Sequence, residues 1–181
     1  MKLHLGCGER FLEGYIHIDL AEFEHIDFKI PVNNLSIFDD NSIDEIYASH
    51  VIEYFDRDEV KELLKEWKRV LRDGGILRIA VPNFSKLIEV YKNTGDLQNI
   101  LGPLYGKWSI DETNKIYHKT AYDKQSLSAV LQEAEFKDIV EWDWRNVFAH
   151  YDDYDDHSQA YFPHMDKTKG IHISLNLECH K

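Results

Sequence analysis

The first twenty residues constrain the fold of this chain more than any other segment. Residues 2–5 have the alternating pattern of a short strand, and a Gly-Cys-Gly turn at 6–8 follows directly. Residues 15–19 then predict a second strand that ends in Asp19. Glycine accepts backbone angles and close contacts that a side chain would block, so backbone N–H groups in such a turn can approach a ligand. A carboxylate at the tip of the next strand can accept hydrogen bonds from both ribose hydroxyls. The segment therefore predicts a nucleotide site.

The spacing within this segment separates two kinds of nucleotide. A dinucleotide fingerprint needs G-x-G-x-x-G at the start of a helix, with its acid about 20 residues further on. Here Phe11 takes the place of the third glycine, and Asp19 follows Gly8 by eleven residues (19 − 8). That gap leaves no room for a full helix between the two strands. The spacing therefore disfavours NAD and an NAD-dependent oxidoreductase.

Length and composition indicate one globular domain over residues 1–181, because a chain of this length can bury a single core. No apolar run approaches the roughly 18–20 residues that a membrane helix needs, and the N-terminus lacks the pattern of a signal peptide. Cys7 and Cys179 lie at opposite ends without metal-ligand spacing, which is typical of a reducing compartment. We therefore expect a cytoplasmic protein with no membrane partner.

The charge balance argues against one class of partner. The chain has 33 acidic and 21 basic residues, which gives a formal net charge of −12. Binding to a nucleic acid requires clustered Lys and Arg side chains. The one basic cluster, four residues within 65–72, alternates with apolar positions on a predicted helix. We therefore expect no nucleic acid partner and a small-molecule polar substrate.

Hydrophobic periodicity predicts strands that alternate with helices. Apolar residues recur at three- and four-residue spacing over 60–71, which indicates a helix. This alternation indicates an α/β fold with a parallel sheet covered on both faces. No helical pattern separates the last two strands, so the final strand is expected to run antiparallel, at or near the edge. The other predicted strands are 26–28, 43–48, 76–81, 136–144 and 171–178, and the other predicted helices are 85–93 and 123–134.

Four segments in order resemble class I S-adenosylmethionine-dependent methyltransferases. The run Leu-Gly-Cys-Gly at 5–8, with Asp19, is similar to the first two motifs of that family. Residues 40–53 resemble its D-N-S-F-D strand and H-V-L-E-H turn, and residues 64–81 and 119–139 resemble later segments. The resemblance implies a doubly wound, mostly parallel, seven-stranded Rossmann-like sheet with an antiparallel last strand. It also implies S-adenosyl-L-methionine as the cofactor, with the glycine turn at its methionine moiety and Asp19 at its ribose.

Some positions depart from the family pattern. Tyr54 stands where a histidine is frequent. Residues 31–35 lack the acid that commonly binds the adenine amino group, so adenine would be bound by an Asn side chain, with Asn34 as the candidate, or by backbone groups. The helix that usually precedes the first strand is also absent. A cover over the cofactor is therefore missing, or it comes from a partner subunit, as in a homodimer.

A long connection over 145–170 is predicted between the last two strands. In an open parallel sheet, ligands bind beyond the carboxyl ends of the strands, and this connection would lie over that crevice as a lid. The run from His150 to His157 alternates carboxylates and imidazoles and could hold a divalent ion. Its spacing matches no dedicated metal cage. We therefore favour a solvated acidic loop and predict no metal site.

Methyl transfer requires an aligned nucleophile and, for a hydroxyl, a group that removes its proton. A histidine suits that role near neutral pH. His50 is the first candidate because it directly follows a predicted strand and should face the crevice. Capping of the following turn, or packing on the cofactor, is the alternative role for His50. His118, His157 and His164 are the next candidates.

The sequence thus predicts an S-adenosylmethionine-dependent methyltransferase that acts on a small polar acceptor, such as a hydroxyl of a sugar or surface-polysaccharide precursor. The alternative is a non-catalytic cofactor-binding domain that serves as a regulatory or partner subunit. The predicted catalytic residues are His50, His118, His157 and His164. The predicted cofactor-binding residues are Leu5, Gly6, Cys7, Gly8, Asp19, Leu20, Asn34, Ser49 and His50.

Overall fold

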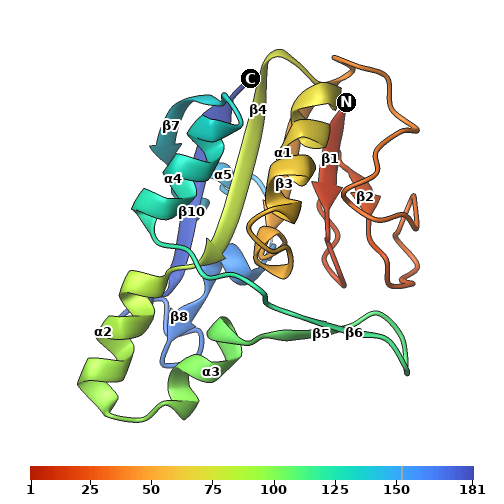
Figure 1. Ribbon diagram of the computed structural model, residues 1–181. Coiled ribbons are helices and arrows are strands. Elements are labelled where there is room, and N and C mark those ends of the chain that lie inside the picture. Colours follow the sequence, from red (N-terminus) through yellow and green to blue (C-terminus); the bar gives the residue numbers. More distant parts are fainter. Residues whose placement is uncertain (152) are drawn as a thin grey trace.

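A six-stranded sheet forms the centre of the computed structural model, which describes residues 1–151 and 153–181 (Figure 1). The spatial order of its strands is β2-β1-β3-β4-β10-β7. Strands β1 to β4 run parallel, and β10 pairs antiparallel with both β4 and β7. The structure therefore confirms the α/β class with its antiparallel last strand. The bounds are β1 (Lys2–Leu5), β2 (Ile16–Ile18), β3 (Ile43–Ser49), β4 (Leu71–Pro82), β7 (Lys137–Glu141) and β10 (Ser174–His180).

The number of strands in the described part of the chain corrects the prediction of seven. The segment predicted as a short strand at 26–28 contributes a single parallel bridge, between Phe28 and Ile18, beside the edge strand β2. The N–H groups of Asp27 and Phe28 both donate to the carbonyl of His17. The segment therefore touches the edge of the sheet at one point and does not extend along it.

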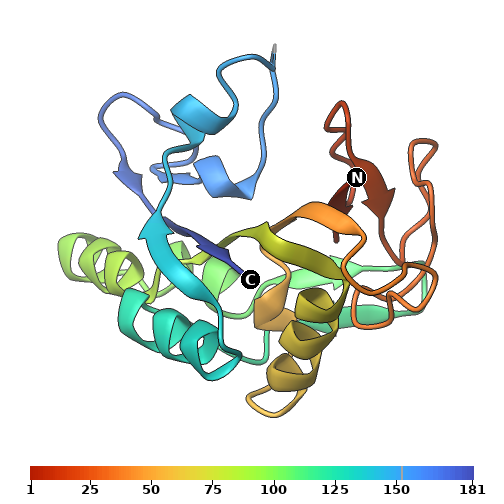
Figure 2. The ribbon, with the colours of Figure 1, turned by 90° about the horizontal axis from the view of Figure 1, so that it is seen from above.

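One face of the sheet is covered by α1 (Glu59–Val70) and α4 (Lys124–Glu133) (Figures 1 and 2). Before α1, the carboxylate of Asp56 accepts from the N–H of Glu59, and the carboxylate of Glu59 accepts from the N–H of Asp56. This is a reciprocal capping arrangement. Helix α4 begins with a capping box at Asp123. The apolar stripe of α1, including the fully buried Trp67, packs on Leu and Ile side chains of the sheet.

The opposite face is covered by the segment between β7 and β10, residues 142–173, which Figure 2 shows on the far side of the sheet from α1 and α4. Its first part packs Trp142 and Phe148 on Tyr47 of β3, with ring centroids 6.0 and 5.6 Å from that of Tyr47. We call residues 142–173 the lid segment. Its elements are α5 (Trp144–Val147), η2 (His157–Gln159), β8 (Tyr161–Phe162) and β9 (Ile171–His172).

Chain direction explains why the two faces differ. Parallel strands are joined by right-handed crossovers. The connections from β2 to β3 and from β3 to β4 step in one direction along the sheet and lie on the α1 face, whereas the β1–β2 connection steps back and belongs to the other face. Residues 6–15, all of which the structure describes, contain no helix. The lid segment therefore covers a face that the short β1–β2 connection cannot.

A buried carboxylate fixes the lid segment to the sheet. Asp156 accepts hydrogen bonds from the hydroxyls of Tyr47 and Tyr154 and from the backbone N–H and hydroxyl of Ser158. From β10, the Asn176 amide donates to the carbonyl of Ser158 at 3.0 Å. Asp156 belongs to the run that was predicted to be a solvated acidic loop. It is instead buried, and each of its carboxylate oxygens accepts two hydrogen bonds within the protein. Asp152, in the same run, lies outside the described residues.

The remaining elements lie beyond the carboxyl ends of the strands (Figure 1). The turn η1 (Ile52–Tyr54) follows β3, and α2 (Phe84–Thr94) and α3 (Gln98–Leu104) follow β4. A hairpin of β5 (Lys107–Ser109) and β6 (Lys115–Tyr117) then extends towards the β1 and β2 side of the sheet. None of the helices in the described ranges combines the length and apolarity needed to cross a membrane.

Candidate active site

A cavity of about 840 Å³ opens at the carboxyl ends of β1 and β3. Three parts of the chain enclose it: the glycine turn after β1, the β5–β6 hairpin with α3, and the part of the lid segment from Asp156 to Met165. The volume lies within the range of small-molecule and cofactor sites, roughly 300–1,000 Å³. The cavity therefore lies where the sequence predicted a crevice.

The glycine turn is built by two left-handed residues, Gly6 with φ +62° and Gly8 with φ +54°. The N–H of Gly6 donates to the carbonyl of Ile18 at 2.8 Å, which ties the turn to β2. A Cβ atom at Gly6 would approach Val51 to 2.5 Å, and one at Gly8 would approach the Trp108 ring to 3.1 Å. Glycine is required here by both backbone angle and space.

Asp19 stands at the end of β2, as predicted, and organises the same turn. One of its carboxylate oxygens accepts from the N–H of Gly8 at 2.8 Å, and the other accepts from the N–H of Ala21 at 2.8 Å. Each oxygen of an ionised carboxylate has a second lone pair. Asp19 lines the cavity and can therefore still accept hydrogen bonds from hydroxyl groups of a ligand.

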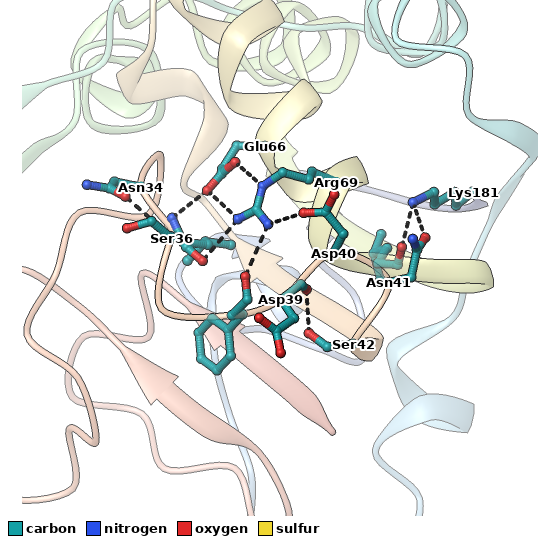
Figure 3. A network of polar contacts seen from close by, with 12 residues as sticks. Asn34, Ser36, Asp39, Asp40, Asn41, Ser42, Glu66, Arg69 and Lys181 are labelled. Carbon is teal, nitrogen blue, oxygen red and sulfur yellow. Dashed lines mark hydrogen bonds and ion pairs between the residues drawn. The ribbon is translucent and has the colours of Figure 1, made fainter.

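The loop before β3 is anchored to α1 by a charged network (Figure 3). The guanidinium of Arg69 pairs with Glu66 on the same helix and with Asp40 on the loop. It also donates to the carbonyls of Leu35 and Phe38, each at 3.1 Å. Five donors in a planar fork suit Arg to this bridging role. The network holds the loop in a fixed position relative to the cavity.

This anchoring places the two neighbouring asparagines differently. Asn33 lines the cavity together with Pro31 and Val32, and the carbonyl of Val32 accepts from the indole of Trp67 at 2.8 Å. Asn34 lies outside the lining, and its Oδ1 accepts from the N–H of Ser36 (Figure 3). The predicted adenine-binding residue is therefore one position away from the asparagine that reaches the cavity. In an irregular loop, no sequence pattern indicates which of two neighbouring side chains points into a cavity.

The β5–β6 hairpin supplies the cover that the sequence analysis expected to be missing or to come from a partner. Trp108 lies over Gly8, and Ile110 and Ile116 from the same hairpin also line the cavity. His118 follows β6 and brings an imidazole to this wall. No role was predicted for residues 95–117, because the contact between Trp108 and Gly8 joins residues about a hundred positions apart and leaves no local pattern.

All four predicted catalytic histidines line the cavity. His50 follows β3 with a left-handed φ of +55° and a side chain that is 13% exposed. Its ring centroid is 5.1 Å from that of His157, which comes from the opposite wall. His118 and His164 lie further round the same space. Burial lowers the pKa of His50 well below its usual value, and the neighbouring His157 and His118 add to the effect.

Glu53 lies behind His50 and His118 and was not among the predicted site residues. It is 1% exposed, and among the described residues neither carboxylate oxygen has a hydrogen-bond partner. Burial raises its pKa to about 8. The sequence contained Glu53 within the H-V-I-E-Y turn, but only the fold shows that η1 directs this acid inward. An unpartnered buried carboxyl beside two imidazoles is a marker of a functional site.

The other predicted cofactor-binding residues fall into two groups. Leu20 and Ser49 line the cavity, and the hydroxyl of Ser49 is buried without a partner among the described residues. The side chain of Leu5 is fully buried in the core on the α1 face and does not line the cavity. Cys7 lines it, but burial and the nearby Asp19 raise its pKa to about 12, so the thiol stays protonated.

No cluster of three or more His, Cys, Asp or Glu side chains able to hold a metal ion occurs in residues 1–151 and 153–181. In the acidic run, Asp155 instead pairs with Lys167 at 3.1 Å.

A family model described as a methyltransferase domain matches residues 19–79, from the end of β2 to the middle of β4. This segment contains Asp19, Asn33, His50 and Glu53, and its neighbours in space are the glycine turn and the hairpin. Residues 19–79 are thus similar to a methyltransferase domain. The match confirms the family expected from the sequence and agrees with S-adenosylmethionine as the cofactor. A search of curated protein sequences found no match.

Solved structures share the fold across nearly the whole domain. A 1,6-didemethyltoxoflavin N1-methyltransferase of Burkholderia thailandensis, solved with its ligand and S-adenosylhomocysteine, superposes with a TM-score of 0.57 at 14% identity over 99% of this chain and 70% of that chain. An S-adenosylmethionine-dependent methyltransferase of Archaeoglobus fulgidus superposes with a TM-score of 0.58 at 16% identity, over 99% of this chain and 85% of that chain. Another, of Methanosarcina mazei, superposes with a TM-score of 0.57 at 16% identity, over 99% of this chain and 91% of that chain. Identities this low establish the fold of the methyltransferase domain and leave its acceptor open.

Proposed function

We propose that this methyltransferase domain transfers a methyl group from S-adenosylmethionine to a hydroxyl of a small polar acceptor, with a sugar or surface-polysaccharide precursor as the acceptor class. One observation carries the proposal: a single cavity contains both the nucleotide-type elements, Gly6–Gly8 and Asp19, and the imidazole of His50. Donor-binding and proton-accepting groups therefore share one enclosed space. Residues 145–170, within the lid segment, complete the wall opposite the glycine turn.

The lining fits the cofactor. The left-handed glycines leave room for close approach to the backbone, Asp19 retains free lone pairs, and the unpartnered Ser49 hydroxyl offers a buried polar group. We expect Gly6, Gly8, Leu20 and Asp19 to hold the methionine and ribose parts, and Asn33 to contact the adenine. When bound, the cofactor supplies an electrophilic methyl group.

The protein's own part is to align the acceptor, exclude water and take up a proton. A hydroxyl oxygen that accepts a methyl group must lose its proton, and a positioned histidine contributes roughly 10²–10⁴-fold to such a step. His50 occupies the junction of the glycine turn and the lid segment, with His118, His157 and His164 around it. This ring of imidazoles supports a polar acceptor. The carboxylate of Asp156 does not, because its hydrogen bonds are made within the protein.

The cofactor part of the proposal is tested by calorimetric binding of S-adenosylhomocysteine to the wild type, Gly8→Ala and Gly14→Ala. Both glycines lie in the β1–β2 connection at positive φ, +54° and +82°, so alanine imposes similar backbone strain at each. Only Gly8 lines the cavity. We expect at least a tenfold loss of affinity for Gly8→Ala and little change for Gly14→Ala. Equal effects of the two substitutions, or no binding by the wild type, would contradict the proposal.

The acceptor class is tested separately by methyl transfer to panels of sugars, nucleotide sugars and phenols. Transfer to sugar hydroxyls with at least a hundredfold loss in His50→Ala supports the proposal. Efficient transfer only to apolar or amine acceptors would overturn the acceptor class while leaving the cofactor assignment intact.

A further inference from the structure

The carboxyl of Glu53 faces two imidazoles and, among the described residues, no cationic partner. Its Oε1 is 3.5 Å from Nδ1 of His50 and 3.8 Å from Nε2 of His118. Among the described residues, no Lys or Arg forms an ion pair with it. The phenols of Tyr54 and Tyr122 are the other titratable groups that sense Glu53, and burial raises the pKa of both with Glu53 as a secondary cause. The protonation of this carboxyl therefore depends on the two histidines.

The hydrogen bonds of His118 determine what it presents to Glu53. Its Nδ1 lies 2.9 Å from the carbonyl oxygen of Pro103. A carbonyl oxygen can only accept, so Nδ1 carries the proton. Nε2 of the neutral ring then directs a lone pair at Glu53. A lone pair and an ionised carboxylate would repel each other in a buried site.

The same reasoning applies to His50 on the other side of Glu53. The hydroxyl of Ser174 donates to Oδ1 of Asn176 at 2.7 Å, and the amide of Asn176 is oriented by its donation to Ser158. Ser174 therefore offers an oxygen lone pair to Nε2 of His50, 3.4 Å away, which places the ring proton on Nε2. Nδ1 of His50 then also directs a lone pair at Glu53. Two lone pairs at one carboxyl require a proton on Glu53.

We propose that Glu53 and His50 form a proton-storing pair whose charge follows the charge of the ligand in the cavity. The pair is neutral when the cavity holds no cation, with one proton on Glu53 and one on Nε2 of His50. A cationic ligand above it stabilises the anionic form, in which Nε2 has lost its proton and the Glu53 proton has moved to Nδ1. The inference rests on the proposed function, since the methyl donor carries a positive sulfonium.

This arrangement makes His50 a proton acceptor only when the methyl donor is bound. The Nε2 lone pair appears as the cation enters, because opposite charges attract strongly in a site shielded from water. When the acceptor oxygen bonds to the methyl carbon, the electron pair of the broken carbon–sulfur bond stays on sulfur, and the hydroxyl proton goes to Nε2 of His50. The sulfur is then uncharged and the Glu53–His50 pair is neutral again. Glu53 touches no substrate atom and is a positioning residue.

The test compares ligands that differ in charge. Calorimetric titrations of S-adenosylmethionine, its stable cationic analogue sinefungin and the uncharged-sulfur product S-adenosylhomocysteine are run at pH 7 in two buffers of different ionisation enthalpy. The buffer dependence gives the number of protons released. We expect the two cationic ligands to release close to one proton more than S-adenosylhomocysteine, since Glu53 with a pKa of about 8 starts protonated.

Two variants with the same Glu-to-Gln substitution assign the proton. Glu53→Gln keeps a neutral side chain that can donate to either imidazole, so we expect it to fold and to abolish the difference between the ligands. Glu62→Gln removes an exposed carboxylate that pairs with Lys65 on α1 and should leave the difference intact. In wild-type protein with ¹³C-labelled glutamate, the Glu53 carboxyl should titrate near pH 8 and shift down by about two units or more with sinefungin.

The outcomes separate the two proposals. Binding of all ligands with equal proton release overturns this inference alone, as does a Glu53 signal that titrates near its ordinary value of about 4. Signals of His50 and His118 that change on treatment with EDTA also overturn it, because the carboxylate would then be holding a metal ion. If none of the ligands binds, both the proposed function and the dependence of the Glu53–His50 charge on the ligand are overturned. If Glu53→Gln does not fold, the wild-type ¹³C titration still decides.

Discussion

The two faces of the central sheet are stabilised by different chemistry. On the α1 and α4 face, Leu3, Ile79 and Leu177 meet aliphatic side chains and Trp67 in a dry core. On the lid face, the alternate positions carry polar and aromatic groups: His4, Tyr47, Arg78, Asn176 and Glu178. The first face is held by non-directional burial, and the second by hydrogen bonds and ion pairs that require one particular arrangement. The face that bounds the cavity is therefore also the one that depends on a particular polar geometry.

The largest effect is expected on the helix face. Trp67→Ala removes a fully buried ring and its hydrogen bond to the carbonyl of Val32. We expect a loss of about 3–5 kcal/mol in the free energy of unfolding, measured with urea. The loop that carries Asn33 should also loosen, with faster hydrogen exchange at 32–36. A loss below about 1 kcal/mol would contradict a tightly packed helix face.

The lid face should respond with a smaller and more local change. Asp156→Ala leaves the buried hydroxyl of Tyr47 without its acceptor and removes the partners of Tyr154 and Ser158. We expect a loss of about 2–3 kcal/mol, with hydrogen exchange rising first over 154–162. Asp155→Ala, which breaks only the partly exposed pair with Lys167, is the control and should cost less than about 1 kcal/mol. Equal costs for the two variants would mean that the lid is not held by Asp156.

Acid should weaken the lid face selectively. Burial, and secondarily His17 and His25, lowers the pKa of His4 well below 6.5. Between pH 6.5 and that lowered pKa the unfolded chain binds a proton that the folded protein resists, so stability falls as pH falls, by up to about 1.4 kcal/mol per pH unit for His4. Glu53 acts in the opposite sense, because its raised pKa makes the folded protein bind more protons from pH 8 down to 4.5.

The contribution of His4 is isolated by comparing urea unfolding of the wild type and His4→Gln from pH 7.5 to 5.5. The stability difference between the two proteins should shift in favour of His4→Gln as the pH falls below 6.5. Parallel curves for the two proteins would show that His4 is not held neutral by the fold.

The smallest effect is expected outside both faces. The side chain of Lys65 on α1 is 68% exposed and pairs with Glu62 one turn away. Lys65→Ala should change the free energy of unfolding by no more than about 0.5 kcal/mol, because exposed ion pairs are screened by water. A larger loss would show that the exposed side of α1 contributes to stability more than its contacts indicate.

Local patterns predicted much of the fold. The strand at 2–5, the glycine turn, the acid at the end of β2, and the helices α1 and α4 all appear where the sequence predicted them. These features depend on residues close together in the chain. Strands that alternate with helices led us to expect a sheet covered on both faces, whereas the structure places Arg78, Asn176 and Glu178 on a polar face that the lid segment covers.

The candidate site could be predicted only in part. His50, Asp19 and the glycines follow strands directly, so strand order alone brings them to one end of the sheet. Asn33 and Glu53 could not be chosen, because the direction of a side chain in a loop or a short turn depends on what packs around it. Trp108 had no signal at all, since the hairpin contributes nothing to the sheet and closes the cavity only through distant contacts.

The amino-acid sequence specifies the order of the elements and the glycine turn with its acid, since each depends on short-range pattern and backbone geometry. The tertiary structure alone decided which segments cover the cavity, which asparagine lines it and that Glu53 lies unpartnered beside two histidines. Those outcomes depend on long-range packing and on hydrogen bonds between residues far apart in the chain. The segments that cover the cavity, the asparagine that lines it and the protonation of Glu53 all follow from such contacts, and no local pattern encodes them.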